Sequence, residues 1–449
     1  MRRQTPFSLV AGIALVAALG TMWACSNNGR RGGGGTTGDG GTPLNPGGCS
    51  GLACFQVDCG TGTSTTLTGK VYAPNGIDPV YNAAVYVPAT LPEFPGTVQC
   101  EACNEPLGGT PVVTTNTGVD GSFTLTNVPA TKSVPIVVQK GRFRRVFNLD
   151  VQACTSVALT KEQTRLPKNQ QEGDLPKMAV GVGNYDQIEC VLRSIGIDEA
   201  EFTPPTGNGA VHLYQNYEDF GGGGNINSMG SLLTNAAKLN TYNLLFMNCT
   251  GTRAETQPTG WKQNMFNYVN SGGRLYVTDW AYDYMEQVQE FAPYIFFEGA
   301  GTEKPPQPAG TAFDAWSGSD LKGTLVDSTL AEWMKIAGAS SDGTINIIGS
   351  WALANHMSAD ETNFPSHTWV QGSASGKTRP MTATFDYNMC GKVLWSSYHT
   401  QEPGGGGFDT AAGGGFPSYC KSTPTTMIAQ EKVLEFLIFQ ISDCVTPIM

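Results

Sequence analysis

Basic residues are scarce in this chain. Its 449 residues include 27 lysines and arginines against 38 aspartates and glutamates, a formal net charge of −11. This deficit argues against a nucleic-acid partner and against electrostatic docking on anionic lipid. Histidine is rarer still, with four residues, and His212, His356 and His367 do not stand at metal-ligand spacing. We therefore expect no metal site and no cofactor.

Long apolar runs are also scarce, and the clearest one lies near the N-terminus. Arg2 and Arg3 precede an apolar segment at residues 7–19, which is shorter than the roughly 20 residues that a membrane-spanning helix needs. A small residue then precedes Cys25, so we interpret residues 1–24 as a secretory signal rather than as an uncleaved anchor. This run resembles the bacterial lipoprotein signal, and the resemblance implies that Cys25 is acylated. We expect a protein of the cell envelope, held to the outer membrane or the periplasmic face by acyl chains on Cys25.

Twelve cysteines indicate an oxidising compartment. Cys49, Cys54 and Cys59 form a cluster within residues 25–60, a segment that otherwise reads as a flexible Gly/Thr-rich tether. Cys100 and Cys103 form a C-x-x-C pair. A zinc site is the alternative, but histidine is absent from this part of the chain and the spacing fits no zinc ribbon, so we expect disulfides.

Residues 61–160 alternate in short β-branched and aromatic runs separated by turn residues, which predicts an antiparallel β-sandwich. The segments GKVYAPNG, TGVDGSFTLTNVPA and VPIVVQKGRFRRVFNL resemble carboxypeptidase regulatory-like domains. The resemblance implies a prealbumin-type fold, usually without a catalytic role. Carbohydrate binding is an alternative function that it also implies. Phe94, Phe143 and Phe147 are candidate sugar platforms, although they also suit a core.

After a polar linker at residues 161–176, short apolar strands alternate with helical periodicity over residues 177–449. This alternation predicts a parallel sheet with right-handed crossovers. The first helix has Asp186 as its expected N-cap and Gly196 at its end. Further helices are predicted at about 226–239, 261–270 and 327–337, and a last helix is predicted to begin at Thr423 and Pro424. Residues of about 300–380 are predicted to form an insertion in this domain.

The ligand crevice of such a sheet lies at the carboxyl ends of its strands. Polar residues follow three of the predicted strands at this position. The candidate crevice consists of Asn184, Asn248, Thr250, Asp279 and Trp280.

The segments YNLLFMNC, NYVNSGGRLYVTDW and GKVLWSSYHTQE resemble the class I glutamine amidotransferase-like superfamily, which includes the ThuA-like proteins. The resemblance implies a flavodoxin-like α/β domain with a mostly parallel sheet. We therefore expect a multidomain chain in which the N-terminal antiparallel β-sandwich is followed by this domain. Amidotransferases place a nucleophilic cysteine in an elbow after the fourth strand and a histidine and glutamate in a late H-P-E motif. Here the elbow position reads Thr278-Asp279-Trp280, without sulfur. The late motif runs from His399 to Glu402, one residue longer than H-x-E.

The candidates for any remaining catalysis are Cys249, which ends the preceding strand, and Asp279, with His399 and Glu402 as partners. We expect Cys249 to form a disulfide instead. The domain combination resembles a family of exported bacterial lipoproteins, some of which are labelled tryptophan synthase alpha chain. An all-β block followed by one parallel sheet does not fit the barrel that this label implies.

We therefore expect a lipid-anchored envelope protein that acts as a non-catalytic binding or scaffolding module. Its partner would be a small molecule, a glycan or an envelope protein. The first alternative is a hydrolase that acts on an amide or a glycan through Cys249 or Asp279 with His399. The second alternative is carbohydrate binding through the β-sandwich.

Overall fold

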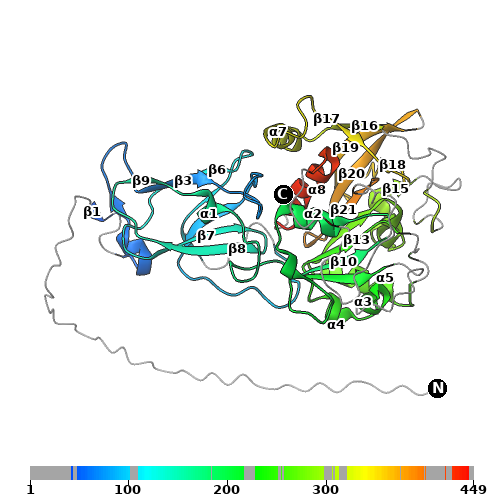
Figure 1. Cartoon of the computed structure of the whole chain (residues 1–449), viewed down its shortest axis with the longest axis horizontal. Coiled ribbons are helices and arrows are strands. Elements are labelled where there is room, and N and C mark those ends of the chain that lie inside the picture. The colour runs from blue at the N-terminus through cyan, green and yellow to red at the C-terminus, as the bar shows by residue number, and fades with distance from the viewer. Residues whose placement is uncertain are drawn as a thin grey trace, which may run out of the picture. The chain divides into compact units, whose positions relative to one another are not determined.

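The computed structural model contains a strand-rich region and an α/β region (Figure 1). It describes residues 42–43, 48–101, 110–183, 185–216, 228–250, 254, 257–297, 306, 309–312, 321–374, 376–398, 400, 420 and 427–443. No helix within these ranges is long and apolar enough to cross a membrane. Residues 1–24 and Cys25, for which a secretory signal and acylation are predicted, lie outside the described residues.

The strand-rich region contains two sheets. A three-stranded sheet has the order β6-β3-β9 and a four-stranded sheet the order β5-β4-β7-β8. Their pairings are antiparallel except for β3 with β9. Leu67, Val85 and Ile136, from both sheets, belong to one buried core, because burying one apolar face of each sheet requires the other sheet. The strands are β3 (Thr66–Lys70), β4 (Ala84–Pro88), β5 (Pro111–Asn116), β6 (Ser122–Leu125), β7 (Val134–Lys140), β8 (Phe143–Leu149) and β9 (Ser156–Ala158), with a separate pair, β1 (Thr42–Pro43) and β2 (Val57–Asp58).

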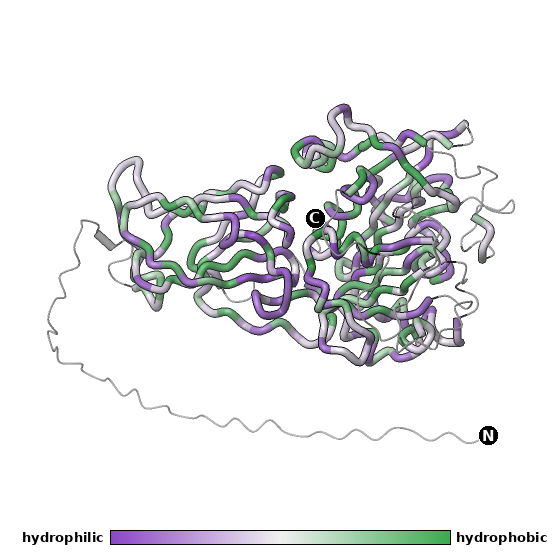
Figure 2. Tube along the Cα trace, viewed as in Figure 1, coloured by the Kyte–Doolittle hydropathy of each residue, from purple (hydrophilic) through white to green (hydrophobic). Residues whose placement is uncertain are grey.

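The α/β region is built on one ten-stranded sheet, of order β11-β12-β10-β13-β14-β21-β20-β19-β16-β17. The first six strands in this order pair in parallel. Strands β10, β13 and β14 are buried along their whole length, as expected for parallel strands with both faces covered, and Figure 2 shows hydrophobic stretches in the middle of this region. Bounds are β10 (Met178–Val182), β11 (Phe202–Thr203), β12 (Val211–Gln215), β13 (Leu244–Met247), β14 (Arg274–Thr278) and β21 (Gly391–Ser396).

Four antiparallel strands extend the same sheet beyond β21. The sheet is therefore mixed rather than mostly parallel, because the predicted insertion, in which the segments INIIGSW and HTWVQGS read as strands, contributes β16, β17 and β19 to its edge. A further pair, β15 with β18, forms a separate small sheet. Bounds are β15 (Ile295–Phe297), β16 (Leu321–Leu325), β17 (Thr344–Ile347), β18 (Ala354–Met357), β19 (Ser366–Ala374) and β20 (Lys377–Tyr387).

The helices agree with the sequence periodicity in part. Gly196 ends α2 in the left-handed conformation, with φ of 110°, as predicted, but the N-cap is Gln187 rather than Asp186. The helix predicted at 226–239 is divided into α3 and α4. Thr423 and Pro424, the predicted start of the last helix, lie outside the described residues. The helices are α1 (Lys161–Thr164), α2 (Ile188–Ile195), α3 (Met229–Leu233), α4 (Ala236–Leu239), α5 (Trp261–Asn270), α6 (Asp283–Glu286), α7 (Ser328–Ile336) and α8 (Ala429–Ile441).

Disulfides join both neighbouring and distant parts of the chain. The described residues form Cys49–Cys54, Cys59–Cys154, Cys100–Cys390 and Cys190–Cys420. Cysteines of the N-terminal cluster are thus used in disulfides, as predicted. Because disulfides persist in oxidising environments, these pairs indicate a protein outside the cytoplasm.

Helix α8 carries a buried ion cluster with the strand-rich region. The Nζ of Lys432 lies 2.6 Å from Asp78 Oδ2 and 2.9 Å from Glu435 Oε2. Glu435 has no exposed surface and Asp78 retains 4%. A second contact is the hydrogen bond of 2.8 Å that Trp333 Nε1, on α7, donates to the carbonyl of Pro79.

Candidate functional site

The carboxyl ends of β13 and β14 bring three of the predicted crevice residues to one edge of the sheet. These strands are neighbours, so the residues that follow them, Asn248 and Thr250 after β13 and Asp279 after β14, lie side by side. All three are buried, with exposed fractions of 0%, 1% and 0%. Trp280 is partly exposed, whereas Asn184 lies outside the described residues.

Asp279 occupies the elbow position after β14 with φ of +43°, a conformation that side chains other than glycine rarely adopt. Its Oδ1 accepts hydrogen bonds from the backbone amides of Trp351, at 3.0 Å, and Ala352, at 2.6 Å. Burial raises the pKa of this carboxyl well above its ordinary value; the two amides oppose the shift and the charge of Asp186 adds to it. Burial therefore favours the protonated form of this carboxyl, whose Oδ1 fixes the backbone that follows β17.

Cys249 carries a thiol, and our expectation of a disulfide at this position is wrong. It takes part in none of the four disulfides formed by the described residues, and its Sγ lies 4.0 Å from Asp279 Oδ2, to which it donates. Its side chain is almost entirely buried, at 3% exposure. The backbone amide of Cys249 donates to Thr278 Oγ1 at 2.8 Å. The two candidate reactive groups, thiol and carboxyl, are thus adjacent but enclosed.

Asp186 is the residue of this site that sequence reasoning misassigned. As an N-cap it would have accepted an amide from within α2. Instead its Oδ1 accepts from the amide of Thr400 at 2.9 Å, and its Oδ2 accepts from Thr278 Oγ1 at 2.5 Å. The carboxylate therefore ties the segment after β21 to the end of β14. This link depends on the register of three strands and leaves no local sequence signal.

Buried amides complete the same edge of the sheet. Asn248 Nδ2 donates to Glu189 Oε2 at 2.9 Å, and its Oδ1 has no hydrogen-bond partner among the described residues. Asn216 follows β12 as Asn248 follows β13, and its Oδ1 accepts from Tyr284 Oη at 3.1 Å. Sequence analysis missed Asn216, although its place directly after a strand was the available signal. The arrangement is a buried polar network at the strand ends.

The remaining predicted partners cannot be placed in this network. His399 and Glu402 lie outside the described residues. No group of three or more His, Cys, Asp or Glu side chains that could hold a metal ion occurs within the described ranges.

The aromatic candidates of the strand-rich region are mostly engaged. The guanidinium of Arg144 lies 4.0 Å from the centroid of the Phe94 ring, and Phe143 is buried, at 1% exposure, against Phe439. Phe147 is partly exposed. Phe147 also packs against the hydrophobic core with part of its surface.

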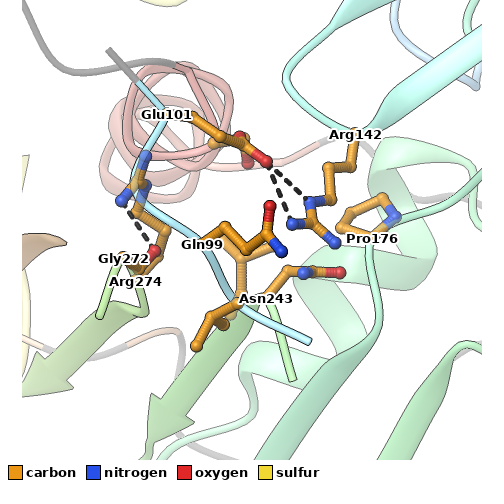
Figure 3. Close-up of a pocket in the computed structure, with 10 residues that line it drawn as sticks. Gln99, Glu101, Arg142, Pro176, Asn243, Gly272 and Arg274 are labelled. Carbon is orange, nitrogen blue, oxygen red and sulfur yellow. Dashed lines mark hydrogen bonds and ion pairs between the residues drawn. The ribbon is translucent and has the colours of Figure 1, made fainter. Parts of the chain in front are cut away.

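A small cavity lies at the opposite, amino ends of β13 and β14 (Figure 3). Its walls include Asn243, Arg274 and the ion pair of Arg142 with Glu101, in which Nη2 and Oε1 are 3.0 Å apart. The cavity has a volume of about 20 Å³, which is enough for one water molecule. It is a packing defect between fixed side chains rather than a ligand site.

Comparison with known proteins does not name a family for this chain. No family model matches the sequence, and no curated protein matches it. A structure described as a ThuA-like protein from Parabacteroides merdae is 13% identical, with a TM-score of 0.34, and covers 61% of this chain and 91% of its own. A structure described as a GMP synthase subunit, from Thermoplasma acidophilum, is 8% identical, with a TM-score of 0.32, and covers 60% and 94%. A ThuA-like protein from Bacteroides uniformis is 9% identical, with a TM-score of 0.30, and covers 58% and 89%. Likeness at this level carries no argument about activity.

Proposed function

We propose that this protein is a lipid-anchored component of the cell envelope whose α/β region is a non-catalytic binding or scaffolding module. The observation that carries the proposal is the state of the elbow residue. Asp279 has no exposed surface and uses one carboxyl oxygen to hold the amides of Trp351 and Ala352. A nucleophile has to reach its substrate. A sealed carboxyl that fixes a loop stabilises the fold instead.

The envelope location rests on the disulfides and on the signal-like N-terminal run. Disulfides indicate a protein outside the cytoplasm, and acylation of Cys25 supplies the attachment. Growth with an alkyne fatty acid should label the wild-type protein and a Ser26→Ala variant, which is the matched control. Cys25→Ala should lose the label and move to the soluble fraction. A labelled, membrane-bound Cys25→Ala protein would contradict the anchor.

A hydrolase is the second candidate, because the Cys249 thiol is directed at a carboxyl in a strained backbone conformation. Alkylation of the native protein, mapped by mass spectrometry to the Cys249 peptide, separates the two functions. For a binding module, Cys249 should react only after denaturant exposes it. Rapid alkylation in the native state, with a rate that titrates below the ordinary thiol pKa, would favour the hydrolase.

A further inference from the structure

A wide cavity of the α/β region lies apart from the elbow. Three segments line it: residues 289–294, which precede β15; residues 362–365, which precede β19; and residues 386–389, which connect β20 to β21. Its volume is about 740 Å³, within the range typical of pockets for small organic ligands. All of its lining residues are described, so its walls can be examined side chain by side chain.

Aromatic rings form the apolar part of these walls. The Tyr294 and Phe364 rings stand at 80° with centroids 5.3 Å apart, and the Tyr294 and Tyr387 rings stand at 60° and 6.3 Å. These are edge-to-face and tilted packing contacts, so the three rings form one aromatic wall of the cavity. Tyr294 is fixed by stacking on Phe385 at 4.0 Å, and Tyr387 packs against Phe291 at 5.2 Å. The aromatic walls are therefore preorganised.

The charged part of the walls is negative. Glu290 and Asp386 line the cavity, and no lysine, arginine or histidine does. Neither carboxyl forms an ion pair within the described ranges. Lys392 stands opposite Asp386 across the β20 and β21 pair, and the charges of Lys392 and Arg274 act on the Asp386 carboxyl, so Glu290 supplies the negative charge that these cations do not compensate. Burial raises the pKa of Asp386, so an added cation would stabilise its ionised form.

The charges of the two carboxyls act on the tyrosines of the wall. Burial chiefly, and then the charge of Glu290, raises the pKa of Tyr387. The pKa of Tyr294 is raised to about 12 by burial, with further contributions from Tyr387 and Asp386. Aromatic faces attract cations through their quadrupole, and nearby carboxylates add to this attraction.

We propose that the cavity lined by Tyr294, Phe364, Tyr387 and Glu290 binds an organic cation with a quaternary ammonium group. The aromatic side chains that line the cavity supply the π-electron surface that attracts such a group, and Glu290 supplies the opposite charge. This site goes beyond the proposed function, because it depends neither on acylation of Cys25 nor on the chemistry of Asp279.

Choline and its neutral isostere 3,3-dimethylbutan-1-ol provide the test, since they differ in charge but hardly in shape. In isothermal titration calorimetry of the full chain, choline should bind about tenfold or more tightly than the isostere. Tyr387→Leu and Glu290→Gln should each weaken choline binding by about threefold to tenfold. Tyr387→Phe, which keeps the aromatic ring, should weaken choline binding less than Tyr387→Leu does. Glu332→Gln, which removes an exposed carboxylate on α7, should bind as the wild type does.

Equal affinity for choline and the isostere, or no choline binding by a folded wild-type protein, would overturn the proposal. Loss of binding in Glu332→Gln equal to that in Glu290→Gln would overturn it as well, because the effect would then be one of net charge. Phosphatidylcholine vesicles distinguish the sources of the cation. Binding of vesicles together with choline indicates a lipid headgroup, and binding of choline alone indicates a soluble ligand.

Discussion

The buried cluster of Asp78, Lys432 and Glu435 predicts a specific pH dependence of stability. One ammonium group lies between two carboxyls that are almost fully enclosed. Burial raises the pKa of Glu435 to about 8; Lys432 opposes this shift and Asp78 adds to it. A proton on Glu435 removes the charge of one of the two carboxyls that face the Lys432 ammonium.

The sign follows from the two states of the chain. Glu435 has a pKa near 4.5 when exposed and about 8 when folded, so the folded protein holds a proton that the unfolded chain has released. Its contribution to stability is complete below pH 4.5 and is lost as the pH rises through 8. Between pH 6 and pH 9 this loss amounts to about 2–3 kcal/mol. Glu435→Gln keeps the shape of the neutral carboxyl and cannot ionise, so its stability should not show this loss.

Urea unfolding of the wild type and Glu435→Gln at pH 6 and pH 9 measures the effect. The two proteins should have similar midpoints at pH 6, and the variant should unfold at higher urea at pH 9. Glu332→Gln, a variant of an exposed residue on α7, should have the same urea midpoint as the wild type at pH 6 and at pH 9. If Glu435→Gln and the wild type lose stability in parallel, Glu435 is ionised at pH 6 and the assignment of the proton is wrong.

Three further changes test the fold at the strand ends and in the strand-rich region. In urea unfolding, the free energy of unfolding of Asp279→Asn should lie within about 1 kcal/mol of the wild-type value, whereas that of Asp279→Ala should be lower by about 2–4 kcal/mol. Equal losses in the two variants would show that Asp279 is ionised. Replacing Cys59 and Cys154 together by serine opens a 95-residue loop and should cost about 2–5 kcal/mol, seen as a lower melting temperature; no change would show that this disulfide adds little. Gly183→Ala would bring Cβ to 2.2 Å from the carbonyl oxygen of Cys249, so we expect a marked fall in melting temperature, and an unchanged melt would refute the close approach.

The sequence predicted helices well where the pattern that marks them lies within the helix itself. The periodicity of residues 261–270 predicted α5, and Gly196 marked the end of α2, because helix period and left-handed termination are local properties. The sequence also predicted a strand-rich region and an α/β region. It did not predict how the edge of the large sheet is assembled, since β16 pairs with β19 across the intervening α7, β17 and β18, and β19 connects this edge to β20. Such pairings carry no local signature.

The candidate site shows the same division between local and non-local information. The positions of Asn248 and Asp279 could be inferred because each directly follows a predicted strand. The chemical state of Asp279 could not, since it depends on the amides of Trp351 and Ala352, some seventy residues later in the chain. Through these two hydrogen bonds Asp279 holds a loop in place, although its backbone keeps the positive φ of the elbow position. A strained backbone therefore indicates where a reactive group would stand in such a fold, but the partners of the side chain decide whether it can react.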